Sequence, residues 1–274
     1  MNNVNLKNIF DKKQLIIGVV HLKPLPGSPL YKGESVESIF EMALQDTESY
    51  LKGGIDCIIV ENHGDIPFSK PSDIGPETVS MMSVITSKLN EKFKKKIIFG
   101  VNVLANDAIS AMAVAKATNA SFVRVNQYVN AYISNEGIIE GLAAKITRYR
   151  KWLNAESVKI FSDVHVKHGS HAIVSDRSIT ELAKDSEFFN ADVLIATGNR
   201  TGGDAIEDEV LEIKNATSLP VLVGSGVKEE NLDLYHPICD GFIVASSLKY
   251  EGFWENHVEY ERVKSFVNTL KLLS

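Results

Sequence analysis

The segment Val221-Leu222-Val223-Gly224-Ser225-Gly226 is a β-branched, apolar run that ends directly in small turn residues. This pattern is typical of a short parallel strand that is buried on both faces of a sheet. Seven other apolar runs are also followed by a turn or a polar cluster, and amphipathic, helix-like segments lie between them. These runs are residues 15–20, 57–60, 97–103, 122–125, 158–166, 193–196 and 242–245.

The alternation of strands and helices predicts an α/β fold with a parallel sheet. Helices are expected at residues 35–51, 78–93, 108–117, 141–152, 179–189, 204–217 and 254–272. Eight such units in 274 residues fit a closed (β/α)8 TIM barrel better than an open, doubly wound sheet, which is the alternative. No linker rich in glycine, serine or proline interrupts the pattern, so we predict a single barrel domain over residues 1–274. The long connection 62–76 is expected to be an ordered loop on the catalytic face.

The composition argues against several classes of function. The chain carries 29 Lys+Arg and 35 Asp+Glu, a formal charge of −6, whereas a nucleic-acid binder needs a basic surface. No apolar stretch is long enough to span a bilayer, and the first residues lack the pattern of a signal peptide. Cys57 and Cys239 lie in apolar runs, which indicates free thiols. We therefore expect a cytoplasmic protein with no nucleic-acid or integral-membrane contact, and a homo-oligomer is compatible with this class of barrel.

Polar residues gather at the carboxyl ends of the first five predicted strands, where a TIM barrel carries its active site. A charged side chain inside an apolar strand is costly unless it is paired or functional. Because side chains alternate along a strand, Asp163, His165 and Lys167 are expected to share one face, and Arg124 and Asn126 to share another. The candidate residues of this region are His21, Glu61, Asn102, Arg124, Asn126, Asp163, His165 and Lys167.

We assign these residues predicted roles. The predicted catalytic residues are Glu61, Asp163, Asn126 and His21, and the predicted substrate-binding residues are Asn102, Arg124, His165 and Lys167. Two carboxylates that face one cavity suit general acid–base catalysis, and the alternative is an ion pair with Arg124 or Lys167. The alternative for His21 is a structural role, in which its ring only forms hydrogen bonds. Lys167 is either an amine that forms a Schiff base or, as we favour, a solvent-exposed cation.

A metal-dependent hydrolase is a further alternative. Its ligands would be His21, Glu61 and either Asp163 or His165. The spacing of the histidines matches no zinc signature, however. We therefore predict neither a metal nor a cofactor.

Small residues follow the last two predicted strands, at Gly224-Ser225-Gly226 and Ala245-Ser246-Ser247. Such residues let backbone N–H groups approach a phosphate, and a short helix after the eighth strand would add its positive dipole end. TIM barrels frequently bind phosphate at this place, although tight turns alone would also explain the glycines. The predicted phosphate-binding residues are Gly198, Gly224, Ser225, Gly226, Ser246 and Ser247.

The stretch Gly18-Val19-Val20-His21-Leu22-Lys23-Pro24-Leu25-Pro26-Gly27-Ser28-Pro29 resembles the N-terminal signature of the BtpA family. Later blocks are similar to that family as well: Val60-Glu61-Asn62, Gly100-Val101-Asn102-Val103-Leu104, Phe122-Val123-Arg124-Val125-Asn126, Asp163-Val164-His165-Val166-Lys167-His168, Ala196-Thr197-Gly198 and Gly224-Ser225-Gly226-Val227. The resemblance implies a phosphate-binding (β/α)8 barrel. The family is named for a role in photosystem I biogenesis, and members from organisms without photosynthesis are regarded as candidate enzymes. The resemblance supplies no assigned set of catalytic residues.

From the residues, we predict an enzyme whose partner is a small phosphorylated sugar or nucleoside-like metabolite. The number of carboxylates favours acid–base chemistry at a glycosidic carbon, as in a hydrolase or glycosidase. One alternative is a phosphosugar isomerase or aldolase. The other is a non-enzymatic assembly or regulatory factor of the photosystem-biogenesis type.

Overall fold

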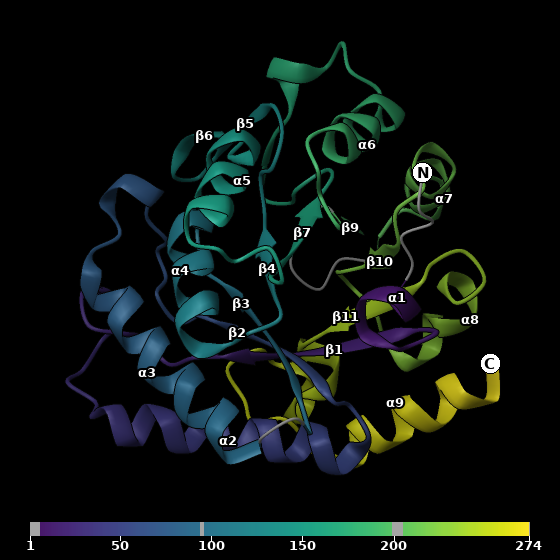
Figure 1. Cartoon of the computed structure of the whole chain (residues 1–274). Helices are drawn as coiled ribbons and strands as arrows, with labels where there is room; N and C mark the ends of the chain where they lie inside the picture. Colours follow the sequence, from purple (N-terminus) through teal and green to yellow (C-terminus); the bar gives the residue numbers. More distant parts are fainter. Residues whose placement is uncertain (1–5, 94–95, 199–204, 274) are drawn as a thin grey trace.

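The computed structural model describes residues 6–93, 96–198 and 205–273. In this part of the chain, eight parallel strands close into a barrel that helices surround (Figure 1). Their order around the barrel is their order in the sequence, which confirms the predicted TIM barrel. The barrel strands are β1 (Leu15–His21), β2 (Cys57–Glu61), β3 (Ile98–Asn102), β4 (Phe122–Val125), β7 (Lys159–Asp163), β9 (Val193–Ala196), β10 (Val221–Val223) and β11 (Gly241–Val244).

Each predicted helix is present, with modest shifts at its ends. The helices are α2 (Val36–Gly53), α3 (Pro76–Phe93), α4 (Ala108–Thr118), α5 (Ala143–Trp152), α6 (Ile179–Phe188), α7 (Glu207–Ala216) and α9 (Tyr260–Leu273). Local sequence sets these ends: Ser35 caps α2 by accepting a hydrogen bond from the Ser38 N–H, and Gly54 ends it with a φ of 101°. The expected start of α7 at Asp204 lies outside the described residues.

The last helix begins at Tyr260 rather than at Trp254, because residues 254–259 form a turn and an isolated bridge between Val258 and Lys249. Before this segment, the chain after β11 forms two tight turns, the 3-10 helices η4 (Ser246–Leu248) and η5 (Tyr250–Gly252). The expected helix at the end of the eighth strand is therefore a single 3-10 turn, which has little macrodipole. The remaining short helices are η1 (Pro71–Asp73), η2 (Ala172–Val174), η3 (Glu229–Asn231) and α8 (Leu232–Tyr235).

Apolar side chains fill the amino-terminal part of the barrel interior. Ile17, Ile59 and Ile195 belong to this inner cluster, and the helix α1 (Leu6–Phe10) packs against it. The Phe10 ring packs edge-on against Phe122, with ring centroids 6.0 Å apart. A larger cluster fills the space between the strands and the outer helices. By contrast, the buried polar side chains of Glu61, Asn102 and Asp163 stand at the carboxyl ends of their strands.

A small second sheet flanks the barrel in the connections after β4 and β7. It comprises β5 (Ala131–Ser134), β6 (Gly137–Glu140) and β8 (Gly169–Ser170), paired antiparallel. Tyr132, Ile139 and Val166 form its own apolar cluster. This sheet was not predicted from the sequence, because strands of four and two residues carry too little periodicity to be recognised.

The connection 62–76 is ordered, as expected. Asp65 accepts a hydrogen bond from the Leu25 N–H at 2.7 Å and another from the Asn62 side chain at 2.9 Å, which joins this loop to the loop after β1. Cys57 and Cys239 are free thiols, as predicted. Within the described ranges, none of the helices combines the length and apolarity that crossing a bilayer requires.

Candidate active site

The inward-facing positions change from apolar to polar at the carboxyl end of each early strand. His21, Glu61 and Asn102 are lateral neighbours, because the strand register pairs His21 with Glu61 and Glu61 with Asn102. Apolar residues two positions earlier in the first two strands, Val19 and Ile59, belong to the barrel core. Strand alternation and register therefore bring three predicted site residues together.

The Glu61 carboxylate is at the centre of a polar cluster. His63 Nδ1 lies 3.1 Å from Glu61 Oε1, His21 Nε2 lies 3.8 Å from the same oxygen, and Asn102 donates a hydrogen bond of 2.6 Å to Oε2. Burial alone would raise the pKa of Glu61, but the hydrogen bond with His63 and the positive charge of Arg124 help to outweigh it. The resulting pKa lies well below the usual range, so Glu61 is ionised at neutral pH.

The His21 ring is held from two sides. Its Nδ1 lies 3.4 Å from the backbone carbonyl of Trp254, and its ring stacks on His63 with centroids 4.3 Å apart. Burial, followed by the neighbouring His63 and Lys249, lowers the pKa of His21 well below its ordinary value. His21 is therefore a neutral imidazole at pH 7. His63 was not among the predicted site residues, because it comes after the strand, where alternation gives no direction.

Asp163 is engaged in an ion pair. Arg124 binds it in a bidentate manner, with Nε and one terminal nitrogen each 2.9 Å from a carboxylate oxygen, and Asn126 donates a third hydrogen bond of 3.2 Å. The Asp163 side chain has no exposed surface. The ion pair that the sequence analysis left as an alternative is thus present for Asp163, and its oxygens face Arg124 and Asn126.

Lys167 lines the cavity and is half-buried, whereas we expected an exposed position. Burial and the nearby Arg124 lower the pKa of Lys167 to about 8, although Asp163 and Glu61 oppose the shift. A substantial fraction of this amine is therefore neutral near physiological pH. Burial and a neighbouring cation are also what lower the pKa of lysines that act as bases or nucleophiles in enzymes.

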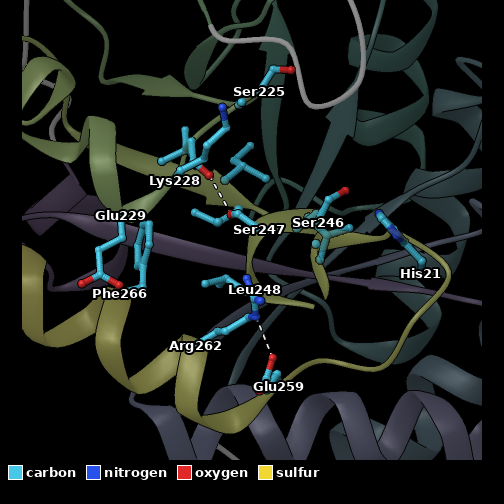
Figure 2. Close-up of a pocket in the computed structure, with 18 of the residues that line it drawn as sticks. His21, Ser225, Lys228, Glu229, Ser246, Ser247, Leu248, Glu259, Arg262 and Phe266 are labelled. Carbon is cyan, nitrogen blue, oxygen red and sulfur yellow. Dashed lines mark hydrogen bonds and ion pairs between the residues drawn. The ribbon is translucent and has the colours of Figure 1, made fainter. Parts of the chain in front are cut away.

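The small-residue turns after β10 and β11 border the same cavity as Glu61, Arg124 and Lys167. This cavity has a volume of about 660 Å³. Figure 2 shows Ser225, Ser246 and Ser247 among the residues that line it, with Ser246 between Ser247 and His21 in this view. The lining residues from the two turns are Gly224, Ser225, Gly226, Ala245, Ser246 and Ser247.

Backbone geometry explains why small residues occupy these turns. A Cβ at Gly224 would lie 2.6 Å from the Ile195 side chain, and Gly226 has a φ of 65°, which side chains disfavour. Ser247 donates a hydrogen bond of 2.7 Å to the Val227 carbonyl and so ties the two turns together. Lys228, which the sequence analysis missed, also lines this part of the cavity.

Three predicted substrate-binding residues are not among the described residues that line the cavity: Asn102, which binds Glu61, and His165 and Gly198. His165 faces Glu209, with Nδ1 3.6 Å from a carboxylate oxygen, and its ring contacts His171 at 4.0 Å. The alternation expected for this residue fails because β7 ends at Asp163. Gly198 is buried after β9 but is not among the described residues that line the cavity, and it directly precedes the undescribed residues 199–204.

Solved structures with this architecture define the fold class. Thiamine phosphate pyrophosphorylase from Pyrococcus furiosus matches with a TM-score of 0.56 at 15% identity, over 98% of this chain and 99% of that chain. Orotidine 5'-monophosphate decarboxylase from Methanocaldococcus jannaschii matches with a TM-score of 0.55 at 16% identity, over 94% of this chain and 98% of that chain. At such identities the likeness establishes the TIM-barrel fold alone.

Sequence similarity defines the family. The sequence pattern of the BtpA family matches residues 12–272, so the chain belongs to the BtpA family. An uncharacterized protein of Pyrococcus horikoshii is 38% identical over 264 residues, which cover 96% of this chain and 98% of the relative. The photosystem I biogenesis protein BtpA of Synechocystis is 36% identical over 268 residues, which cover 97% of this chain and 91% of the relative.

Proposed function

We propose that the protein is an enzyme that acts on a small phosphorylated metabolite of the sugar or nucleotide type. The observation that carries this proposal is that one cavity is lined both by the small-residue turns after β10 and β11 and by Glu61, Arg124 and Lys167. A phosphate bound at the turns would place the rest of the ligand over these charged groups. Binding energy from a remote phosphate can then orient the reacting atoms.

The turns suit a phosphate for three reasons. Gly224 and Gly226 add no side-chain bulk at the turns, Ser225 and Ser246 border the same space, and Lys228 adds a positive charge. Backbone N–H groups and a cation together favour a dianion. Some solved structures of the same fold, among them the pyrophosphorylase and the decarboxylase above, carry the names of enzymes for phosphorylated compounds, which supports this class of ligand.

Proton transfer next to a carbonyl carbon, as in an isomerase or aldolase, is the reaction type that the geometry supports best. Hydrolysis at a glycosidic carbon needs two carboxylates that flank the bond. Asp163, however, is fully engaged with Arg124 and Asn126. Lys167 instead offers an amine of lowered pKa inside the cavity, either as a base or for a Schiff base with a carbonyl.

Ligand binding tests the proposal first. We expect inorganic phosphate and a subset of phosphosugars or nucleotides to raise the melting temperature, by about 5–10 °C at a hundredfold excess over Kd. Gly226→Asp should abolish the shift, because it adds a negative charge at the turn. Gly33→Asp is the matched control, since Gly33 also has a positive φ but lies on an exposed loop. If no phosphorylated compound shifts the wild type, the non-enzymatic alternative is favoured.

Turnover tests the reaction type. The compounds that bind are assayed for isomerisation, carbon–carbon cleavage and release of a base or alcohol from a sugar. Lys167→Met should reduce kcat by at least a hundredfold for a proton-transfer reaction, whereas Lys145→Met on the exposed face of α5 should have no effect. Release of a glycosidic leaving group that survives Lys167→Met but is lost in Glu61→Gln would instead support the glycosidase hypothesis.

A further inference from the structure

We propose that His21, Glu61 and His63 form a binding site for a divalent transition metal ion, with Zn²⁺ as the best-matched ion. One nitrogen from each imidazole and one carboxylate oxygen lie within 4.8 Å of one another. Two histidines and one glutamate are a donor set of catalytic zinc sites, which keep a fourth position open. This proposal goes beyond the phosphorylated ligand and does not require it.

The distances between the donor atoms fit a tetrahedral ion. Metal–ligand distances of about 2.0–2.1 Å place neighbouring ligand atoms about 3.4 Å apart. In the structure, Glu61 Oε1 lies 3.1 Å from His63 Nδ1 and 3.8 Å from His21 Nε2. Both distances differ from this spacing by only a few tenths of an ångström. The third pair, between the two imidazole nitrogens, lies within 4.8 Å, so an ion would draw the two rings closer together.

Neighbouring groups orient the donors as they do around known metal ligands. The Trp254 carbonyl lies 3.4 Å from His21 Nδ1, so a proton on Nδ1 leaves the lone pair of Nε2 directed at Glu61. Asn102 holds the second oxygen of Glu61 at 2.6 Å, which leaves Oε1 for the ion. Such outer contacts fix the tautomer of a histidine and the direction of a carboxylate.

The site is rigid, and its open side faces the cavity. His21 and Glu61 lie at the ends of paired barrel strands, and the exposed fractions of the His21, Glu61 and His63 side chains are 6%, 7% and 14%. All three residues line the cavity that the phosphate turns also border. A bound ion would therefore have its free position toward the ligand, where a Lewis acid could polarise a carbonyl or hydroxyl oxygen.

The donor types predict the selectivity of the site. Two imidazole nitrogens favour Zn²⁺, Co²⁺ or Ni²⁺ over Mg²⁺ and Ca²⁺, which prefer oxygen ligands. We therefore expect Mg²⁺ in millimolar excess to leave bound Zn²⁺ in place. The sequence analysis named His21 and Glu61 as metal ligands in one alternative but paired them with Asp163 or His165, which the structure directs elsewhere.

The test measures metal binding to the full chain in the absence of substrate. Protein treated with a chelator and then dialysed against ZnCl2 should retain one Zn²⁺ per chain, measured by mass spectrometry of the metal content. With CoCl2 it should show the strong visible absorption of a tetrahedral Co²⁺ ion. His63→Leu and Glu61→Gln should each weaken binding by at least tenfold, with circular dichroism confirming that both variants are folded.

His165→Gln is the matched control, because His165 and His171 form another pair of contacting imidazoles. It should bind one Zn²⁺ with the affinity of the wild type. The proposal is overturned if the wild type binds no Zn²⁺, or if folded His63→Leu binds it as tightly as the wild type. Because no phosphorylated compound is present, these outcomes are independent of whether the proposed enzymatic function holds.

Discussion

Lys167 occupies a half-buried position near Arg124, where a positive charge is unfavourable. The facing charges are Arg124, which lowers its pKa, and Asp163 and Glu61, which raise it. With a pKa of about 8, the neutral amine rises from about a tenth of the molecules at pH 7 to about half at pH 8.

If the neutral amine acts in the reaction, kcat/KM should increase about fivefold between pH 7 and pH 8 and level off above pH 9. The second ionisation of a phosphate ester is near pH 6 and is complete before this window. The measurement is the pH profile of kcat/KM on any turned-over substrate. A profile that is flat or falls between pH 7 and pH 9 contradicts this role for Lys167.

Gly226 shows a second effect at the scale of one residue. Its φ of 65° lies in the left-handed region, which is less favourable by about 1–2 kcal/mol for a residue with a Cβ and by less for asparagine. Gly226→Ala should therefore lower the free energy of unfolding by about 1–2 kcal/mol, and Gly226→Asn by less. Urea denaturation of both variants measures the difference. Equal stability of Gly226→Ala and the wild type would show that the turn relaxes.

The residues of the site were only partly predictable from the sequence. Alternation along an apolar strand located His21, Glu61 and Arg124, because the barrel core fixes the inward face of each strand. His63 and Lys167 come after their strands end, where the chain direction depends on tertiary contacts. No local sequence pattern predicts that His63 contacts Glu61 or that Lys167 is partly buried, because both features depend on tertiary contacts.

At the scale of secondary-structure elements, Asp46 connects α2 to the segment after β11. Its carboxylate lies 3.7 Å from the Lys249 ammonium and accepts a hydrogen bond of 2.9 Å from the Val258 N–H. Lys249 is 2% exposed, so its charge depends on this partner. The segment that Asp46 anchors includes Trp254, whose carbonyl lies against His21.

Asp46→Asn should lower the free energy of unfolding by about 3–5 kcal/mol, because it removes the strongest of the negative charges that act on the buried Lys249 ammonium, the others being Glu255 and Glu61. Adding Lys249→Met in the same chain should recover much of this loss, since the unpaired charge is then removed. Urea denaturation of the single and double variants gives both values. A single variant as stable as the wild type would mean that water already reaches Lys249.

Helices and barrel strands were predictable because apolar residues recur along each of them with a regular period. Capping residues such as Ser35 also mark the ends of helices. The sheet of β5, β6 and β8 was not predictable. Its strands are short, and β8 pairs with β5 only because β4 and β7 are already adjacent in the barrel. The late start of α9 has a similar origin, since the Asp46 contacts hold the preceding segment in turns.

At the scale of the whole molecule, the candidate site exists only when the barrel is closed. The phosphate turns follow β10 and β11, whereas Glu61 ends β2, and β1 joins the two groups through its pairing with β11 and β2. The sequence predicted that both groups lie at one end of the barrel, because the carboxyl ends of parallel strands meet there. The seam between β1 and β11 is therefore the contact that assembles the site.

Gly241 makes this seam possible. A Cβ at this position would lie 2.2 Å from the Leu15 carbonyl oxygen, a backbone atom that cannot move without loss of the strand pair. Gly241→Ala should therefore lower the free energy of unfolding by about 1–3 kcal/mol, the usual cost of overpacking. It should also weaken binding of the phosphorylated ligand, although residue 241 does not line the cavity.

Asn215→Ala on the exposed face of α7 is the control for stability and for binding. If Gly241→Ala loses stability but binds as tightly as the wild type, the turns form an anion site without help from the seam. If it loses both, closure of the barrel is what brings the phosphate turns and the charged cluster into one site.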